Sequence, residues 1–280
     1  MIGTLPNPQT AAAEISAGLR AGEMVPYLGP GISALNDPSV PMSPEALAAF
    51  FGTKVALPRR AVGNAWASAQ HIESYKHRST VTALMNEAYA PPVPPSPIHQ
   101  WLAGLDLPLI VDSWYTAEMR RALSARTDWA EVQGITRAGI GEDRWFRFYS
   151  PDGAAIGADE AANAKTLLYT PHGSVAPEGN FLITDADYVE VLTEIDIQTP
   201  IPEIVRERRT SRPFLFLGCR FHDQLLRSYA RQIIKRSSDP HYAVVDFDSL
   251  TRNERNFLEE QNITPVDAPL GGFLEMLMRI

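Results

Sequence analysis

A histidine in a tight turn has the residue type best suited to proton transfer. His172 follows Pro171 and precedes Gly173, just after the short apolar segment Leu167–Tyr169. Between a proline and a glycine, the backbone course is fixed and the side chain has little packing to do. The unperturbed pKa of imidazole, near 6.5, suits general acid–base catalysis. We therefore predict that His172 is a catalytic residue.

A second candidate site is a glycine-rich turn near the start of the chain. The apolar segment Met24–Leu28 is followed directly by Gly29, Pro30, Gly31, Ile32 and Ser33. Two glycines let a backbone turn sharply and approach a ligand, and exposed N–H groups in such a turn can bind a diphosphate. A motif this short is also typical of an ordinary turn from a strand into a loop. Both interpretations stay open on the residues alone.

A later apolar segment also ends in residues with binding chemistry. Leu107–Val111 is followed by Asp112, Ser113 and Trp114. In one interpretation the serine hydrogen-bonds a ribose and the tryptophan stacks on a flat ring. In the other, Ser113 caps the next helix and Trp114 packs in the core.

The most apolar strand of the chain, Phe214–Leu217, leads into Gly218, Cys219 and Arg220. Gly218 again allows a close backbone approach. Asp223 lies at the first turn of the following helix, where the helix dipole favours an acid. This segment indicates either an adenosine pocket or a helix cap. Nothing nearby in the sequence would activate the thiol of Cys219, so we interpret it as inert.

Composition excludes several classes of protein. With 280 residues, 45% of them hydrophobic, the chain can bury a full core without metals or disulfides. A formal net charge of −8 argues against a nucleic-acid partner. The single cysteine excludes a disulfide framework and a four-thiolate zinc site, and we expect no metal. We find no targeting signal and no apolar run of the roughly 20 residues that cross a bilayer, so we expect a cytoplasmic protein without membrane contact.

The elements that must position these residues alternate between short apolar strands and helices. Strands are predicted at residues 24–28, 107–111, 167–169, 181–183, 214–218 and 241–247, the last of the chain. This alternation predicts an α/β fold with a parallel sheet and helices on both faces. Ligands of such sheets bind beyond the carboxyl ends of the strands. Residues 134–162 are predicted to be mostly loop, apart from a hairpin arm at 145–149.

We expect one domain, residues 1–280, with a helical insert at residues 43–105 where helices follow one another without a strand. Ser43 and Pro44 begin the first of these helices. A second helix is predicted at 61–77. Its inward face is predicted from residues spaced three and four apart, namely Val62, Trp66, Ala69, Ile72 and Tyr75.

Taken in order, these segments resemble the sirtuin (Sir2-like) family. The family's Gly-Ala-Gly-Ile-Ser turn corresponds to residues 29–33, and its Leu-His-Gly-Ser turn to residues 171–174. Its final apolar strand and glycine loop correspond to Phe214–Asp223. The chain is most similar to bacterial Sir2-like domains without the zinc module, many of which cleave NAD in defence systems. It is also similar to a group encoded beside nitrogen-fixation genes.

The resemblance implies a Rossmann-like (DHS-type) fold that binds NAD. His172 takes the position of the catalytic base, with Ser113 and Trp114 near the reacting centre. The implied cofactor-binding residues are Gly29, Pro30, Gly31, Ile32, Ser33, Asp112, Gly218, Cys219, Arg220 and Asp223. Pro30 stands where the family has alanine and removes one N–H from the turn.

The family asparagine that orients water or ribose is missing. One alignment puts Trp114 at its position, and a shift by one residue puts Ser113 there. Three functions therefore stay open. The protein is an NAD hydrolase that breaks the nicotinamide glycosidic bond, or a catalytically degenerate sensor or subunit that binds NAD or ADP-ribose. In the third, it is an interaction protein with exposed Trp129 and Trp145 as contacts. Its expected partners are a small-molecule nucleotide and either a second copy of the chain or another protein.

Overall fold

The computed structural model describes residues 5–36, 39–136, 145–194 and 201–280. These residues form a nine-stranded sheet of order β11-β10-β9-β1-β2-β6-β3-β4-β5. The strands from β11 to β3 run parallel, and β4 and β5 are antiparallel. The bounds are β1 Val25–Leu28, β2 Leu109–Asp112, β3 Trp129–Gly134, β4 Phe146–Tyr149, β5 Ala155–Ile156, β6 Thr166–Thr170, β9 Phe214–Leu217, β10 His241–Val245 and β11 Ile263–Asp267.

The central strands are apolar throughout because both of their faces are buried. In β9, Phe214 and Phe216 lie in the core on one face of the sheet. Leu215 and Leu217, which alternate with them, lie in the core on the other face. The predicted α/β fold, with a mostly parallel sheet between two layers of helices, is confirmed.

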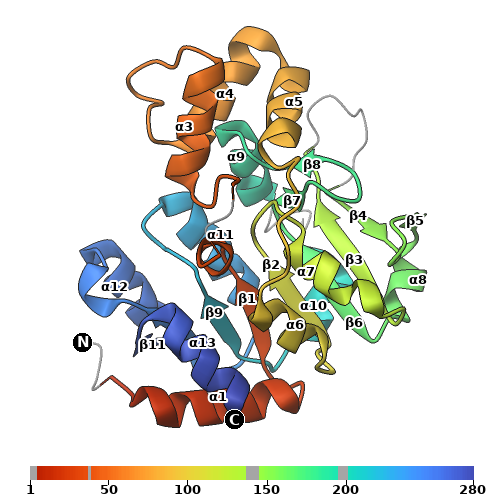
Figure 1. Ribbon diagram of the computed structural model, residues 1–280, viewed down its shortest axis with the longest axis vertical. Helices are drawn as coiled ribbons and strands as arrows, with labels where there is room; N and C mark the ends of the chain where they lie inside the picture. Colours follow the sequence, from red (N-terminus) through yellow and green to blue (C-terminus); the bar gives the residue numbers. More distant parts are fainter. Residues whose placement is uncertain (1–4, 37–38, 137–144, 195–200) are drawn as a thin grey trace.

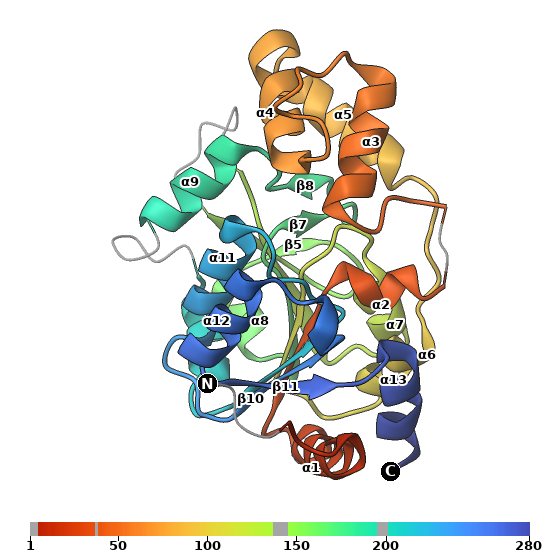
Figure 2. The ribbon, with the colours of Figure 1, turned by 90° about the vertical axis from the view of Figure 1, so that its left-hand side faces the viewer.

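One layer of helices packs on the face that contains Leu215 (Figure 2). It consists of α1 Pro8–Arg20, α6 Pro97–Ala103, α7 Glu118–Ala122 and α13 Leu270–Arg279. The opposite face carries α8 Ala158–Ala162, α10 Glu203–Arg209, α11 Gln224–Ile234 and α12 Arg252–Glu260. In α11, Tyr229 and Ile233 face the sheet, as their spacing predicts.

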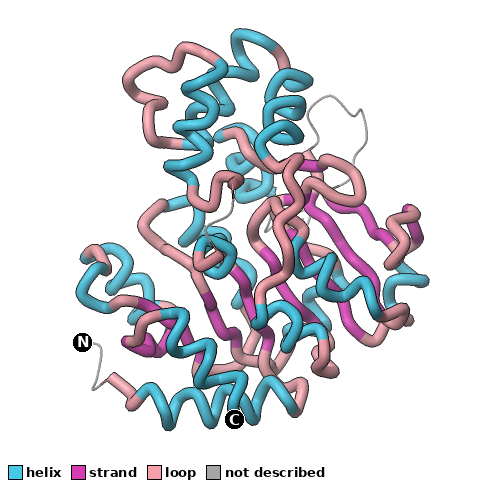
Figure 3. The backbone as a smooth tube through the Cα atoms, viewed as in Figure 1, coloured by secondary structure: helices cyan, strands magenta, loops and turns pink. Residues whose placement is uncertain are grey.

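A group of helices stands at one end of the sheet and forms a third core (Figures 1 and 3). It consists of α3 Pro44–Lys54, α4 Ala65–Lys76 and α5 Arg78–Ala88, with α9 Asp185–Glu194 beside them. We call α3–α5 the insert. By contrast, Ile98 and Leu102 of α6 lie in the core of the sheet layer, so this helix packs with the body.

The inward face predicted for α4 is only partly right. Trp66, Ala69 and Ile72 are buried, but Val62 is 66% and Tyr75 74% exposed. Val62 precedes the helix, which begins at Ala65. Tyr75 lies in the last turn, where its ring packs at a tilt against His71 in place of the core.

Several elements were missed, among them β3, α12 and β11. Strand β3 lies where no strand was predicted, since its sequence contains Glu131 and Gln133, both fully buried. The chain also continues past β10 into α12 and β11, so β10 is not the last strand.

The prediction of an exposed aromatic contact surface is wrong. Trp129 of β3 is 2% exposed and Trp145, next to β4, is 8% exposed. Both belong to the sheet region and help to bury it. Within the ranges that the structure describes, no helix has the length and apolar character needed to cross a membrane.

Candidate functional site

The four predicted segments meet at a cavity of about 200 Å³ between the sheet and the insert. It lies beyond β1 and β9, where the strand order reverses: the chain leaves β1 toward β2 and later returns to β9 on the other side. Gly31, Trp114, His172 and Gly218 all line it. The rest of the wall is largely aromatic and apolar, with Tyr27, Met42, Trp66, Tyr115, Tyr188, Phe221 and Leu226.

His172 is held between two tyrosines. Its ring centroid lies 4.8 Å from that of Tyr229 and 5.3 Å from that of Tyr188. Nδ1 is 3.1 Å from the Tyr188 hydroxyl, whereas buried Nε2 has no hydrogen-bond partner in the part of the chain described. Burial lowers the pKa of His172 to about 3, so the imidazole is neutral near pH 7. The prediction of His172 as a general base depended on a pKa near the working pH, and the lowered pKa does not meet that condition.

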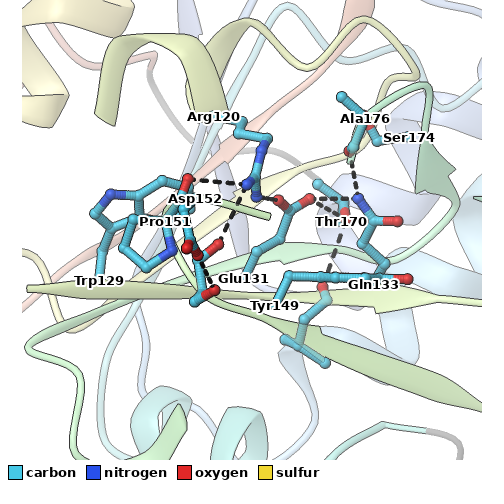
Figure 4. A network of polar contacts seen from close by, with 12 residues as sticks. Arg120, Trp129, Glu131, Gln133, Tyr149, Pro151, Asp152, Thr170, Ser174 and Ala176 are labelled. Carbon is cyan, nitrogen blue, oxygen red and sulfur yellow. Dashed lines mark hydrogen bonds and ion pairs between the residues drawn. The ribbon is translucent and has the colours of Figure 1, made fainter. Parts of the chain in front are cut away.

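A buried polar network fixes the turn that carries His172 (Figure 4). Glu131 of β3 forms an ion pair with Arg120 and accepts hydrogen bonds from Gln133 at 2.6 Å and Thr170 at 3.2 Å. Gln133 also donates to the carbonyl of Ala176, at 2.6 Å, on the far side of the turn. The network therefore joins the ends of β3 and β6 to the loop after His172.

The same turn continues into a small two-stranded sheet. Gly173–Ser174 (β7) pairs with Asn180–Phe181 (β8), and the N–H of Leu182 donates to the carbonyl of His172 at 2.9 Å. The φ of Gly173 is +79°, a conformation that favours glycine. The backbone on both sides of the imidazole is thus held by hydrogen bonds.

In the glycine turn after β1, the glycines serve the contact between two loops. The Gly31 N–H donates to the Gly218 carbonyl at 2.9 Å, and a Cβ on Gly29 would lie 2.5 Å from that same oxygen. Gly218 itself has a φ of +65°. With Pro30 lacking an N–H and that of Gly31 already bonded, neither is free to bind a diphosphate in this arrangement.

The other residues of this turn face away from the cavity. Pro30 and Gly31 line it, but Gly29, Ile32 and Ser33 do not. Ile32 is buried in the core of the sheet layer. The Ser33 hydroxyl donates to the carboxylate of Glu118.

Ser113 and Trp114 both line the cavity, and both have their polar groups engaged. The Ser113 hydroxyl donates to the carbonyl of Leu28 at 2.8 Å, so it does not cap the next helix. The indole N–H of Trp114 donates to the carbonyl of Pro41 at 3.0 Å, and the ring packs beside Tyr115 in the core of the insert. Trp114 therefore packs in the core, as the second interpretation predicted, and it also lines the cavity.

Asp112 lies behind this wall and does not line the cavity. Its carboxylate accepts a hydrogen bond from the backbone N–H of Trp114 at 3.3 Å. Burial, with a contribution from Glu118, raises the pKa of Asp112 to about 7.

Of the residues after β9, some line the cavity and others support the elements around it. Burial raises the pKa of the Cys219 thiol well above its usual value, in agreement with an inert thiol. Arg220 lines the cavity and binds Glu254 through Nε at 3.0 Å and Nη2 at 3.2 Å. Asp223 does not line the cavity and caps α11, its carboxylate accepting the N–H of Leu225 at 2.7 Å.

A contact between a histidine and a glutamate joins the insert to the body at the cavity wall. His222 Nε2 lies 3.2 Å from a carboxylate oxygen of Glu45, at the start of α3. Both residues line the cavity, and both side chains are partly exposed to solvent. This contact links the loop after β9 to the helices that cover the site.

Sequence reasoning missed the aromatic residues around His172. Trp66 was predicted only on the inward face of a helix, and no functional role was predicted for Tyr188 or Tyr229. The three residues come from three separate helices, and no local motif relates them to His172. The only signal was their aromatic type on the inward faces of helices next to the predicted strand ends.

Comparison with known families places a family model on this chain. A family model described as a SIR2-like domain matches residues 108–266, more than half of the chain. The matched range begins just before β2, includes His172 and ends within β11. The glycine turn after β1 lies outside it. The search of curated proteins gave no match.

Proposed function

The chain belongs to the SIR2-like domain family, which suggests an NAD-related function, and we propose that it binds NAD or ADP-ribose beneath the insert without cleaving it. The two nucleotides share an ADP-ribosyl part, and NAD adds a nicotinamide ring. Binding is proposed at the carboxyl ends of β1, β2, β6 and β9, where ligands of such sheets are found.

The observation that carries this proposal is the state of the two positions that align with the family asparagine. The Ser113 hydroxyl and the Trp114 indole N–H both donate to backbone carbonyls. Neither can donate a hydrogen bond to a water or a ribose hydroxyl without giving up a buried hydrogen bond. The absence of a free hydrogen-bond donor on these two side chains favours binding over turnover.

The dimensions of the cavity support partial enclosure of the ligand. Pockets that hold a whole drug-sized molecule measure about 300–1,000 Å³, and this cavity measures about 200 Å³. That volume suits one ring rather than a dinucleotide. Binding of a whole nucleotide would therefore need the wall to open, and the partly exposed contact between His222 and Glu45 crosses that wall.

Cleavage of NAD is the second candidate, favoured by one observation. His172 Nε2 has no partner within the described residues, and its ring lines the cavity. Breaking the glycosidic bond forms an oxocarbenium-like centre that water or a ribose hydroxyl attacks, and a nearby nitrogen could accept the released proton. The low pKa of His172 makes this a poor base near neutral pH.

The test measures binding and turnover on the same preparation. Ligand at 100 times its Kd stabilises a protein by about 2.7 kcal/mol, which for a chain of this size raises Tm by roughly 5 °C. We expect this rise with NAD and with ADP-ribose, and no nicotinamide by mass spectrometry after hours with micromolar protein. No rise with either nucleotide would refute binding. Nicotinamide release that His172→Ala abolishes would establish cleavage instead.

A matched control is His99→Ala. His99 is also a buried histidine with a lowered pKa, but it does not line the cavity. This variant should lower Tm without ligand and keep the ligand-induced rise. Loss of the rise in both variants would show that it reports stability and not the site.

A further inference from the structure

We propose that Tyr188 holds His172 as the Nε2–H tautomer, so that His172 donates a hydrogen bond to an acceptor atom of the ligand instead of taking a proton from it. The identity of the ligand rests on the proposed function. The tautomer rests on the hydrogen bonds of the protein alone and can be measured without any ligand.

The first step concerns the proton of Tyr188. Burial raises the pKa of this fully enclosed phenol well above its usual value, so the hydroxyl keeps its proton. A buried O–H donor needs an acceptor. Within the described residues, the acceptor it reaches with hydrogen-bond geometry is His172 Nδ1, at 3.1 Å.

The neighbours of the Tyr188 oxygen do not offer an alternative. The indole of Trp66 has no acceptor nitrogen, and its Nε1 makes no hydrogen bond among the described residues. The Tyr115 hydroxyl donates to the carbonyl of Leu182 at 2.8 Å, and among the described residues the Tyr188 hydroxyl meets hydrogen-bond geometry with His172 Nδ1. The proton of Tyr188 therefore points to Nδ1.

The second step concerns the imidazole. A neutral imidazole has one N–H and one bare nitrogen. If Nδ1 accepts from Tyr188, the proton of His172 lies on Nε2. This nitrogen is buried without a partner, although the ring lines the cavity. The empty protein thus contains an unsatisfied donor, and a ligand acceptor placed beside it would satisfy that donor.

The surroundings define the kind of group that fits. The rings of Tyr188 and Tyr229 flank the imidazole, and Trp114 and Tyr115 form a further part of the wall. Flat apolar walls favour a flat ring or a sugar face. The buried Nε1–H of Trp66, which also lines the cavity, is a second donor without a partner among the described residues, so the two donors favour acceptor oxygens or nitrogens on that ring. The site is therefore built to recognise a ring that carries an acceptor.

The decisive experiment is long-range ¹H–¹⁵N NMR on the ligand-free, full-length protein labelled with ¹⁵N-histidine. We expect His172 to show a protonated Nε2 and a bare Nδ1 from pH 6 to pH 8. Tyr188→Phe should change this signature, because the donor to Nδ1 is lost. Tyr115→Phe is the matched control, since it removes a neighbouring buried hydroxyl that does not bond to His172, and it should leave the signature unchanged.

A binding experiment tests the role of the donor. His172→Gln keeps an N–H donor but provides no base, and it should retain the affinity for NAD and ADP-ribose within about fivefold. His172→Ala should lose at least tenfold. A protonated Nδ1 in the ligand-free protein, or equal losses in the two variants, would overturn the proposal. Failure of both nucleotides to bind wild type would refute the proposed function but leave the NMR result to decide the tautomer.

Discussion

Replacing Asp112 by asparagine is expected to remove a fall in stability that the wild-type protein shows between about pH 4 and pH 7. Asp112 ends β2 and is 5% exposed. Its charge is opposed by burial and by the carboxylates of Glu118 and Glu131, which together raise its pKa from 3.8 to about 7. The nearby guanidinium of Arg121 is itself bonded to the carbonyls of Val93 and Thr116, not to Asp112.

The sign and size of the effect follow from this shift. Since the pKa of Asp112 is higher in the folded than in the unfolded protein, the unfolded chain releases its proton first as the pH rises. The protonated carboxyl therefore stabilises the fold fully below pH 4, and this contribution is lost as the pH approaches 7. Three pKa units at 1.36 kcal/mol each set the loss at about 4 kcal/mol, an upper value because Glu118 titrates with it.

The measurement is the free energy of unfolding by urea at half-unit steps from pH 4 to pH 8. Asp112→Asn keeps an acceptor for the Trp114 N–H and cannot ionise, so its advantage over wild type should grow with pH. Asp223→Asn is the matched control, because it removes a partly exposed carboxylate that caps a helix. Asparagine can keep this cap, and the variant should lack the advantage of Asp112→Asn that grows with pH. A constant difference between wild type and Asp112→Asn would refute the reasoning.

Two further substitutions test the scaffold of the site by the free energy of unfolding. Gly218→Ala should cost about 2–4 kcal/mol, because φ is +65° and the new Cβ would lie 2.5 Å from a backbone nitrogen; Gly157→Ala, with open space around it, should cost less than about 1 kcal/mol. Arg120→Ala should cost about 3–5 kcal/mol, because it leaves the carboxylate of Glu131 buried without its cation. Lys54→Ala removes a solvent-exposed ion pair and should cost less than about 1 kcal/mol. Equal losses of stability in Lys54→Ala and Arg120→Ala would contradict the role of the buried network around Glu131.

The sequence was most informative where one physical cause determined the residues. Strands β1 and β9 were predicted because strands buried on both faces must be apolar throughout. The turn at His172 and the glycine turns were found because parallel strands bring their carboxyl ends to one edge of the sheet. The cavity lies at that edge and includes Gly31, Trp114, His172 and Gly218.

Prediction failed where tertiary contacts decide. Strand β3 was missed because a buried glutamate and glutamine are unusual in a central strand. They are tolerated here because Arg120, Thr170 and Ala176, which are distant in the sequence, satisfy their polar atoms. The glycines of the first turn were predicted because they let a ligand approach the backbone closely. In the structure, the loop at Gly218 makes this close approach.

A motif indicates where a polar residue lies, but its capacity to act depends on the hydrogen bonds it already makes. Ser113 lines the cavity, yet its hydroxyl is taken by the carbonyl of Leu28, 85 residues earlier in the chain. His172 also lines it, and there the sequence predicted the right edge of the sheet but the wrong pKa, because three separate helices supply the aromatic shell that buries it. Of the two side chains, only His172 has a polar atom still without a partner within the described residues. A ligand can therefore gain a hydrogen bond from His172 without breaking one, and any chemistry in which Ser113 donates its proton must first release its hydroxyl from β1.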